Sequence, residues 1–278
     1  MQSLTWPAFG LFVASGLALA LAIALQPWWR AHRRRALARH PFPAAWRRVL
    51  ARHVPQVRQL PVDLQLRLKQ RMQVFIAEKP FIGCNGLVVT EAMRVVVAAQ
   101  ACLLLLGRPQ AQFDNLRQVL LYPGAFLVDR VQHEAGGVLR DERQALAGES
   151  WSQGQVVLSW DDVLAGAADP ADGRNVVVHE FAHQLDQADG QSNGAPPLPR
   201  GMNARRWARV LQAEFNALQH QLATGQAGLL GAYAATNAAE FFVVASEVFF
   251  EQGPQLAQER PALFAELATF YGVDPRSW

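Results

Sequence analysis

The chain has 278 residues, of which 51% are hydrophobic and 18% are charged, a composition that excludes a disordered polymer and suffices for one medium-sized domain with appendages. Two cysteines are too few for a disulfide framework, which favours a reducing compartment. The net charge of +3 conceals an asymmetry, because twelve Lys or Arg and one acid, Asp63, lie between Arg30 and Arg71, whereas acidic side chains outnumber basic ones 22 to 14 elsewhere.

The first predicted element is a membrane anchor within residues 1–29. Leu4 to Leu25 contains no charged residue and is long enough, as a helix, to cross a hydrocarbon core of about 30 Å. Trp28, Trp29 and several arginines follow, so the positive-inside rule places the rest of the chain on the cytoplasmic side of the inner membrane, as a single-pass protein. The alternative is a cleaved signal peptide, although the segment lacks a basic start and exceeds the usual apolar length.

Residues 30–60 are predicted to be a basic juxtamembrane arm. Basic side chains near a membrane surface are attracted to anionic headgroups by about 1 kcal/mol each. A nucleic-acid surface would require stacking aromatic side chains or a recognised module, and only Phe42 and Trp46 are available here. We therefore predict membrane association through the N-terminal helix and no direct contact with nucleic acid.

Beyond residue 60 the patterns predict a helix-rich α+β domain with a small sheet. Apolar spacing and capping residues predict helices, and short apolar runs predict strands. Between the two strands, the polar segment Gln132 to Gln153 is expected to form a hairpin-like or irregular excursion. The expected helices are Val62 to Ala77, a core helix capped by Thr90 and ending at Leu106, and Ala204 to Leu222, and the expected strands are Tyr122 to Val128 and Gln155 to Trp160.

The sequence His179-Glu180-Phe181-Ala182-His183 lies in a predicted helix, Val176 to Asp189. Residues four apart share a helix face, so both imidazoles can reach one ion while Glu180 lies beside its open position. Two histidines and a glutamate in this spacing are typical of a catalytic zinc site. The alternative is a pair of hydrogen-bonded histidines with an exposed glutamate.

A catalytic zinc ion requires a third protein ligand. Glu240 and Glu247 lie two turns apart on one face of a downstream apolar helix, and a rise of about 10 Å allows only one of them to reach the ion. Spacing does not choose between them. With Asn237 as N-cap, Glu240 also occupies the N3 position of a capping box, which offers a purely structural role.

The segments HEFAHQLD and AYAATNAAEFFVVASEVFF resemble the Mlc titration factor (MtfA) family of zinc metallopeptidases. The similarity extends upstream through Phe81-Ile82-Gly83-Cys84 and covers roughly Leu60 to Tyr271. The catalytic core of this family is similar to the protease domain of anthrax lethal factor. The resemblance implies a zincin-like metallopeptidase domain over residues 61–278.

The resemblance also implies roles for individual residues. His179, His183 and Glu240 are expected to bind one Zn²⁺, Glu180 to act as general base, and Tyr233 to direct its hydroxyl at the developing oxyanion. Asn237-Ala238 replaces the Asp-Pro that is usual in the family. Separately, Asp186 follows His183 by one turn and is expected either to orient a ligand histidine or to be a polar helix end.

Three functions follow as hypotheses. The first is a zinc-dependent peptidase that hydrolyses short peptides in an aminopeptidase-like manner. The second, implied by the resemblance, is a regulatory protein that sequesters a transcriptional repressor. The third is a structural membrane protein with a vestigial site, which would bind no stoichiometric zinc.

Overall fold

The computed structural model describes residues 6–109, 111–133, 139–146, 148–151 and 154–278, and the side chains of these ranges from residue 14 onward except 126–153. Two compact units, Met1–Pro41 and Phe42–Trp278, make up the chain.

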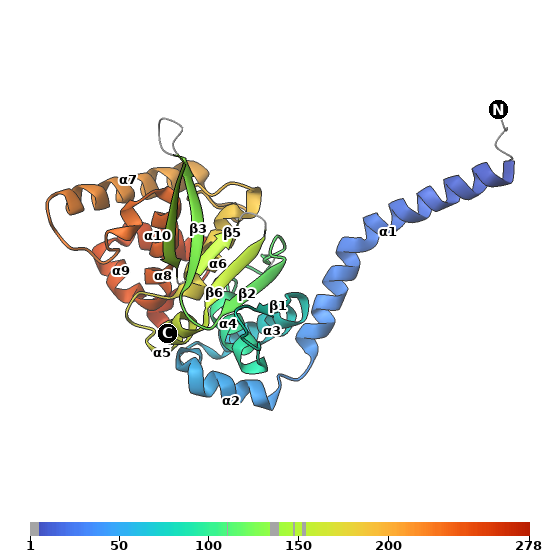
Figure 1. The fold of residues 1–278 in the computed structure, drawn as a ribbon, viewed down its shortest axis with the longest axis horizontal. Helices are drawn as coiled ribbons and strands as arrows, with labels where there is room; N and C mark the ends of the chain where they lie inside the picture. Colours follow the sequence, from blue (N-terminus) through green and yellow to red (C-terminus); the bar gives the residue numbers. More distant parts are fainter. Residues whose placement is uncertain (1–5, 110, 134–138, 147, 152–153) are drawn as a thin grey trace. The chain divides into compact units, whose positions relative to one another are not determined.

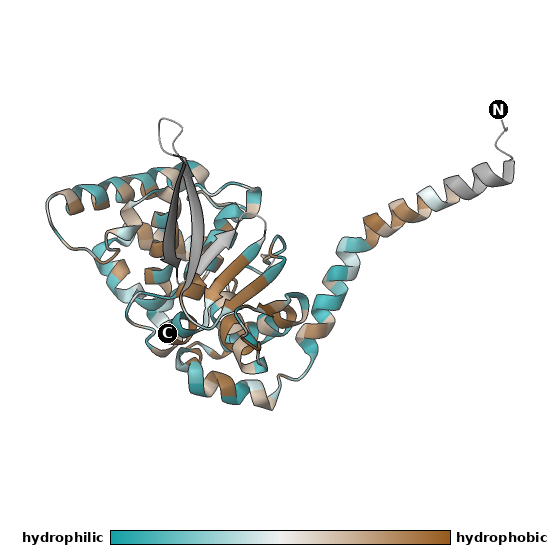
Figure 2. Ribbon diagram, viewed as in Figure 1, coloured by the Kyte–Doolittle hydropathy of each residue, from teal (hydrophilic) through white to brown (hydrophobic). Residues whose placement is uncertain are grey.

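The first unit contains one long helix, α1 (Trp6–Arg39). Its described part is apolar up to Leu25 and becomes rich in arginine after Trp29 (Figure 2). Among the helices in the described ranges, none combines the length and the hydropathy that crossing a bilayer requires. The predicted anchor, Leu4 to Leu25, includes residues that lie outside these ranges, so it stays a prediction.

The second unit begins with α2 (Ala44–His53), a short 3-10 helix η1 (Pro55–Arg58) and α3 (Val62–Glu78). Helix α2 packs against α4 (Glu91–Leu103). This region was expected to be a basic arm, yet it also supplies apolar side chains to the core of the second unit. The buried residues are Phe42, Leu50, Val54, Val57 and Leu60.

A four-stranded mixed sheet has the order β1-β2-β6-β5 (Figure 1). The parallel strands are β1 (Phe81–Gly83), β2 (Gln118–Tyr122) and β6 (Gln155–Ser159), and β5 (Gly148–Trp151) pairs antiparallel with β6 at the edge. Buried side chains occur at consecutive positions of β6, as expected for a strand that is covered on both faces.

The predicted strand from Tyr122 to Val128 is wrong, because β2 ends at Tyr122 and a new strand starts at Phe126. Pro123 has no backbone N–H to donate and therefore interrupts the ladder. Strands β3 (Phe126–His133) and β4 (Leu139–Leu146) form a separate antiparallel pair. The predicted excursion from Gln132 to Gln153 agrees with it only in part, because β3 begins at Phe126 and β5 joins the main sheet.

The predicted helices agree with the structure to within a few residues. Thr90 caps α4, since its hydroxyl accepts from the N–H of Met93, and the run Val95 to Leu106 is buried with no residue more than 4% exposed. The other helices are α5 (Trp160–Ala168), α6 (Val176–Asp186), η2 (Gln187–Asp189), α7 (Ala204–Ala223), η3 (Tyr233–Ala235), α8 (Ala238–Glu251), α9 (Gly253–Glu259), α10 (Pro261–Tyr271) and η4 (Pro275–Ser277).

Helix α6 is the central element for function. It contacts α4, α8 and the strands β5 and β6. Val177, Val178 and Phe181 are fully buried in these contacts. The apolar faces of α6 thus fix its orientation, and the remaining stripe directs its polar side chains toward α8.

Candidate metal centre

Asn175 determines where α6 begins. Its side-chain oxygen accepts from the N–H of Val178 (3.0 Å), which satisfies one of the free N–H groups of the first turn. Counting from this cap places His179 and His183 one turn apart on the same face. Their ring centroids are 5.1 Å apart, so the predicted juxtaposition of the two imidazoles is confirmed.

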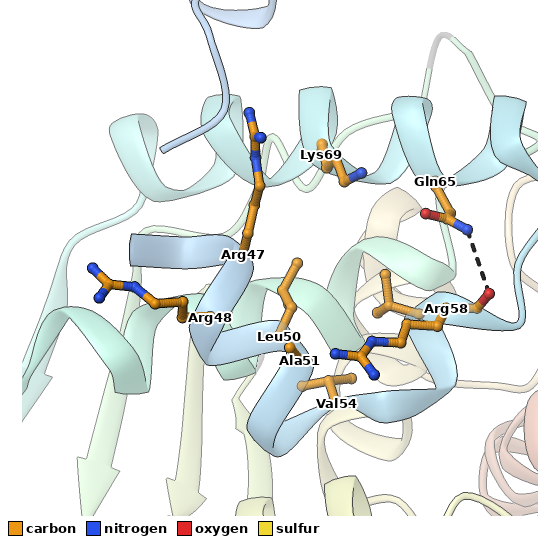
Figure 3. A pocket seen from close by; sticks show the side chains of 9 residues that line it. Arg47, Arg48, Leu50, Ala51, Val54, Arg58, Gln65 and Lys69 are labelled. Carbon is orange, nitrogen blue, oxygen red and sulfur yellow. Dashed lines mark hydrogen bonds between the residues drawn. The ribbon is translucent and has the colours of Figure 1, made fainter. Parts of the chain in front are cut away.

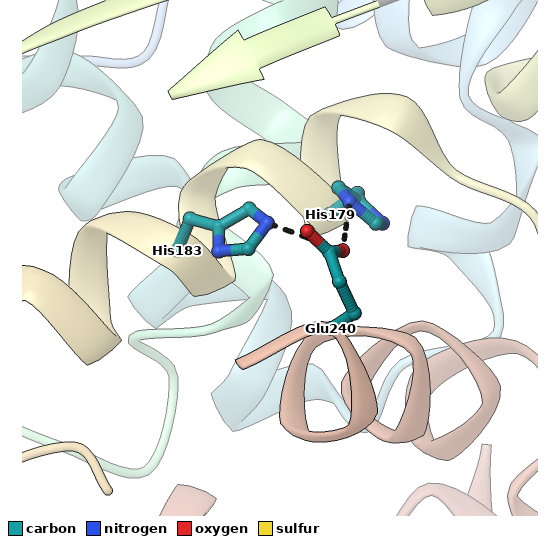
Figure 4. A group of neighbouring side chains, drawn as sticks. All are labelled: His179, His183 and Glu240. Carbon is teal, nitrogen blue, oxygen red and sulfur yellow. Dashed lines mark ion pairs between the residues drawn. The ribbon is translucent and has the colours of Figure 1, made fainter. Parts of the chain in front are cut away.

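Helix α8 supplies the third group. Asn237 caps this helix by accepting from the N–H of Glu240 (3.0 Å), as the sequence predicts. The Glu240 side chain points away from the cap toward α6, and its Oε2 lies 3.3 Å from Nε2 of His179 and 3.5 Å from Nε2 of His183 (Figure 4). Spacing leaves open whether Glu240 or Glu247 is the third candidate ligand. The structure places Glu240, and not Glu247, next to the Nε2 atoms of both histidines.

These three side chains have the properties of a metal-ligand set. One ligand atom from each of His179, His183 and Glu240 lies within 4.8 Å of the other two. The side chains are only 11–17% exposed, and Oε2 of Glu240 is buried without a hydrogen bond. Two imidazole nitrogens and one carboxylate oxygen form the donor set of many catalytic metal sites, so the residues fit a divalent ion.

Glu247 holds His179 from the opposite side of the ring. Nδ1 of His179 lies 2.6 Å from Oε1 of Glu247. An ionised carboxylate can only accept, so Nδ1 carries the proton and Nε2 is left to bind a metal ion. This arrangement fixes both the tautomer and the ring plane of His179.

Asn175 connects this carboxylate to the start of α6. The N–H of Asn175 donates to Oε2 of Glu247 (2.8 Å), and its side-chain amide donates to Oε1 of Glu251 (3.0 Å). Asn175 is 1% exposed, so these bonds are shielded from water. The two helices that carry the ligands are therefore joined by buried hydrogen bonds one turn from the metal centre.

The electrostatics of Glu240 and His179 favour a cation at this site. Burial disfavours charge on Glu240, but the neighbouring imidazoles of His179 and His183 outweigh it and hold the pKa of this carboxyl well below its usual range. Burial lowers the pKa of His179, but the neighbouring carboxylates of Glu240 and Glu247 outweigh it and raise this pKa well above 6.5. Protons and a metal ion compete for the same nitrogens, so metal binding releases protons.

Glu180 and Tyr233 both line a cleft of about 890 Å³ that includes His179. Glu180 is 4% exposed, and burial raises the pKa of its carboxyl to about 7 despite the opposing effect of His179 and His183. Tyr233 lies in η3, 59% exposed, with its ring centroid 6.0 Å from that of His179. The structure therefore brings all five predicted site residues to one place.

Asp186 does not orient a ligand histidine by hydrogen bonding. Its Oδ2 accepts from the N–H of Gly194 (2.9 Å), while Oδ1 and the Nδ1 of His183 are buried without a hydrogen-bond partner in the described part of the chain. Burial raises the pKa of Asp186, and the Gly194 N–H opposes this shift. The supporting role considered for Asp186 is filled by Glu247 instead, acting on His179.

Gly194 brings the loop after α6 close to the start of α8. It has φ +73°, and a Cβ at this position would lie 2.2 Å from the carbonyl oxygen of Ala238. Only glycine fits such a position without strain. This contact lies beside the cap that orients Glu240.

The family model for the glucose-regulated metallo-peptidase M90 matches residues 28–272. The chain belongs to the peptidase M90 family. It is therefore a metallopeptidase of this family, and His179, His183 and Glu240 form a candidate metal site.

Curated relatives support the same assignment. The chain is 34% identical to Mlc titration factor A of Klebsiella pneumoniae subsp. pneumoniae, over 83% of this chain and 86% of the relative. It is 31% identical to Mlc titration factor A of Cronobacter sakazakii, over 89% and 91%. It is also 37% identical to the protein slr2042 of Synechocystis sp., over 90% and 91%. The resemblance to the MtfA family is thus confirmed.

Sequence reasoning missed the supporting residues rather than the ligands. Glu247 was considered only as a rival ligand, and Asn175 only as punctuation before the helix. An asparagine directly before an apolar helical run does signal an N-cap. No local signal indicates that its N–H and side chain would also bind two carboxylates of α8.

Proposed function

We propose that the chain is a zinc-dependent peptidase that hydrolyses short peptides, with His179, His183 and Glu240 as the metal ligands. The observation that carries this proposal is the convergence of two Nε2 atoms and one carboxylate oxygen, beside a cleft that His179 lines. A three-ligand set of this chemistry leaves an open position, which is typical of catalytic rather than structural zinc. When bound, the ion supplies a Lewis acid that polarises the scissile carbonyl and acidifies water.

Glu180 is proposed as the general base. Its carboxyl has a pKa of about 7 because it is buried, which suits a group that must accept and return a proton near neutral pH. It takes a proton from the attacking water and then delivers it to the leaving amine. Tyr233 lines the same cleft. Its hydroxyl donates a hydrogen bond to the carbonyl oxygen of the substrate as negative charge develops there.

The cleft supports an aminopeptidase-like preference. Beyond the catalytic groups, its charged lining residues include two acids, Asp162 and Asp172, and one arginine, Arg174. Exposed carboxylates attract the free α-ammonium of a short peptide. We therefore propose substrates whose amino terminus lies close to the scissile bond.

The test is Glu180→Gln in the full chain. Zinc content should stay at one per chain while peptide hydrolysis falls by about 10²–10⁴-fold, because only proton transfer is removed. The exposed Glu259→Gln provides a matched control and should keep full activity. Full activity in Glu180→Gln would rule out Glu180 as the base, and absence of bound zinc in the native chain would rule out the function.

A second candidate function is capture of a transcriptional repressor. It is supported by the relatives named Mlc titration factor A, which align over most of this chain. The Mlc protein of Klebsiella pneumoniae is the natural probe. Co-elution from a sizing column with both the native and the Glu180→Gln chain would support this function, and separate elution would refute it.

We also propose that the N-terminal helix attaches the chain to the inner membrane, with the peptidase facing the cytoplasm. The apolar run to Leu25, the tryptophans and the following arginines support this proposal. Cell fractionation tests it. Recovery of the full chain in the soluble fraction, at its intact mass, would refute it.

A further inference from the structure

A second pocket, outside the catalytic cleft, lies between α2, η1 and α3. It has a volume of about 350 Å³, which is within the range of small-ligand sites. Its side chains come partly from the predicted basic juxtamembrane arm, residues 30–60, and partly from the predicted helix Val62 to Ala77. They are Arg47, Arg48, Leu50, Ala51, Val54, Val57, Arg58, Gln65 and Lys69 (Figure 3).

The floor of this basic pocket is apolar and well packed. Leu50, Val54 and Val57 are each at most 5% exposed and belong to the core of the second unit. Gln65 ties η1 to α3, because its amide donates to the carbonyl oxygen of Leu60 (2.9 Å) and to that of Arg58 (3.4 Å). The pocket therefore has a fixed base.

Among the described residues that line the pocket, four are cations and none is acidic. Arg47 is oriented by a hydrogen bond from its guanidinium to the carbonyl oxygen of Phe42 (3.0 Å). In the described part of the chain, no ion pair joins a carboxylate to Arg47, Arg48, Arg58 or Lys69. Figure 3 shows Lys69 and Arg58 on either side of the apolar floor, with Arg47 between α2 and α3.

Several other arginines of the second unit do have acidic partners. Arg260 contacts Glu214 at 2.8 Å, Arg276 contacts Asp274 at 2.6 Å, and Arg67, on the same helix as Lys69, contacts Asp63 at 3.4 Å. Four like charges around one pocket repel each other, and an anion would relieve that repulsion. Four cations without a described acidic partner thus surround a pocket that a ligand can enter.

We propose that this basic pocket binds an organic phosphate, namely a phosphate monoester attached to an apolar body. A phosphate monoester carries about −1.5 to −2 charges near neutral pH and offers three acceptor oxygens. Guanidinium groups match these oxygens in bidentate geometry. A carboxylate has one charge and two oxygens, so it would leave much of the positive charge at the rim without compensation. The apolar floor can contact the apolar body of an ester, which inorganic phosphate lacks.

Two sources can supply this chemistry. One is a soluble phosphate ester, and the other is the headgroup of a phosphatidic acid in a membrane. None of the residues that line the basic pocket lines the catalytic cleft. Binding therefore does not depend on the proposed peptidase function, and Glu180→Gln should bind the phosphate ester as the native chain does.

The experiment measures binding of phenyl phosphate to the full zinc-loaded chain by calorimetry, with benzoate as the carboxylate comparison. The pocket variant is Arg58→Gln with Lys69→Gln. Arg205→Gln with Arg209→Gln, two exposed arginines of α7, removes the same net charge elsewhere and is the matched control. Circular dichroism checks that both variants are folded. A second arm measures co-sedimentation with phosphatidylcholine vesicles, with and without phosphatidic acid.

We expect phenyl phosphate to bind the native chain. Its affinity for the pocket variant should be at least tenfold lower, and its affinity for the control variant should be within twofold of the native value. Benzoate should bind at least tenfold more weakly than phenyl phosphate. Equal loss in both variants, no loss in the pocket variant, or equal affinity for benzoate would each overturn the proposal. If the pocket variant loses its binding to phosphatidic acid vesicles and the control variant does not, the natural ligand is the lipid headgroup. If both variants bind these vesicles equally, the natural ligand is a soluble phosphate ester.

Discussion

His179 has a carboxylate on each ring nitrogen, whereas Arg48, Arg58 and Lys69 of the basic pocket have none. The side chains of the candidate metal centre are only 11–17% exposed, and a buried charge without partners would cost several kcal/mol. The basic pocket is open, so its cations stay hydrated and need no internal partner. Single substitutions should therefore have large effects in the first site and small, salt-dependent effects in the second.

The largest effect is expected for Glu240→Ala. Loss of one of three ligands should weaken zinc binding by more than about 100-fold and abolish peptide hydrolysis, since even supporting residues of metal sites are worth 10–100-fold. Zinc titration against a competing chelator measures this change. Glu259→Ala is the exposed control, and its zinc affinity should equal that of the native chain. Tight zinc binding by Glu240→Ala would show that another group completes the site.

The next largest effect is expected for Tyr233→Phe. Loss of one donor to a developing oxyanion typically lowers kcat by about 10²–10³-fold. Zinc affinity and KM should change by less than about threefold, because the hydroxyl is not a ligand. Steady-state kinetics on a dipeptide amide separate these quantities. An unchanged kcat would show that the Tyr233 hydroxyl does not act in catalysis and that the side chain serves only in packing.

Glu247→Gln tests whether the carboxylate of Glu247 controls zinc binding by His179. The substitution keeps the size of the side chain but removes the charge that fixes the tautomer of His179, so zinc affinity should fall by about 10-fold. Glu251→Gln, one turn along α8, does not contact His179 and is the matched control. Equal zinc affinities in the two variants would contradict the positioning role of Glu247.

The smallest effect concerns stability and pH at Glu251. Burial raises the pKa of this carboxyl to about 8 from 4.5, although the Asn175 side chain opposes the shift. Between these values the folded chain retains a proton that the unfolded chain releases, so the free energy of unfolding falls as pH rises from 4.5 to about 8. Glu251→Gln should remove this dependence and stabilise the chain by about 1–3 kcal/mol above pH 8, but not at pH 4.

Urea unfolding at a series of pH values provides the measurement for Glu251. Glu259→Gln, at an exposed position, should follow the native curve throughout. If the free energy of unfolding of Glu251→Gln depends on pH as that of the native chain does, another group causes the loss of stability.

Local geometry explains how much could be predicted from the sequence. The spacing of His179 and His183 and the cap at Asn237 depend only on the helix period, so both were predictable from the residues alone. The choice of Glu240 over Glu247 depends on how α6 and α8 cross, and only the family resemblance supplied it. The packing of α2 was missed because the arginines between residues 30 and 60 dominated the interpretation of this region, although Leu50 and the adjoining Val54 hold it to the core.

The hydrogen bonds that Asn175 makes to α8 have a consequence for metal exchange. They join the two ligand-bearing helices without help from an ion, so chelation should empty the site without unfolding the domain. Reloading would then be fast and reversible, unlike small zinc modules that collapse when stripped. Added zinc should raise the melting temperature only by the ordinary mass-action increment of a ligand that binds the native state.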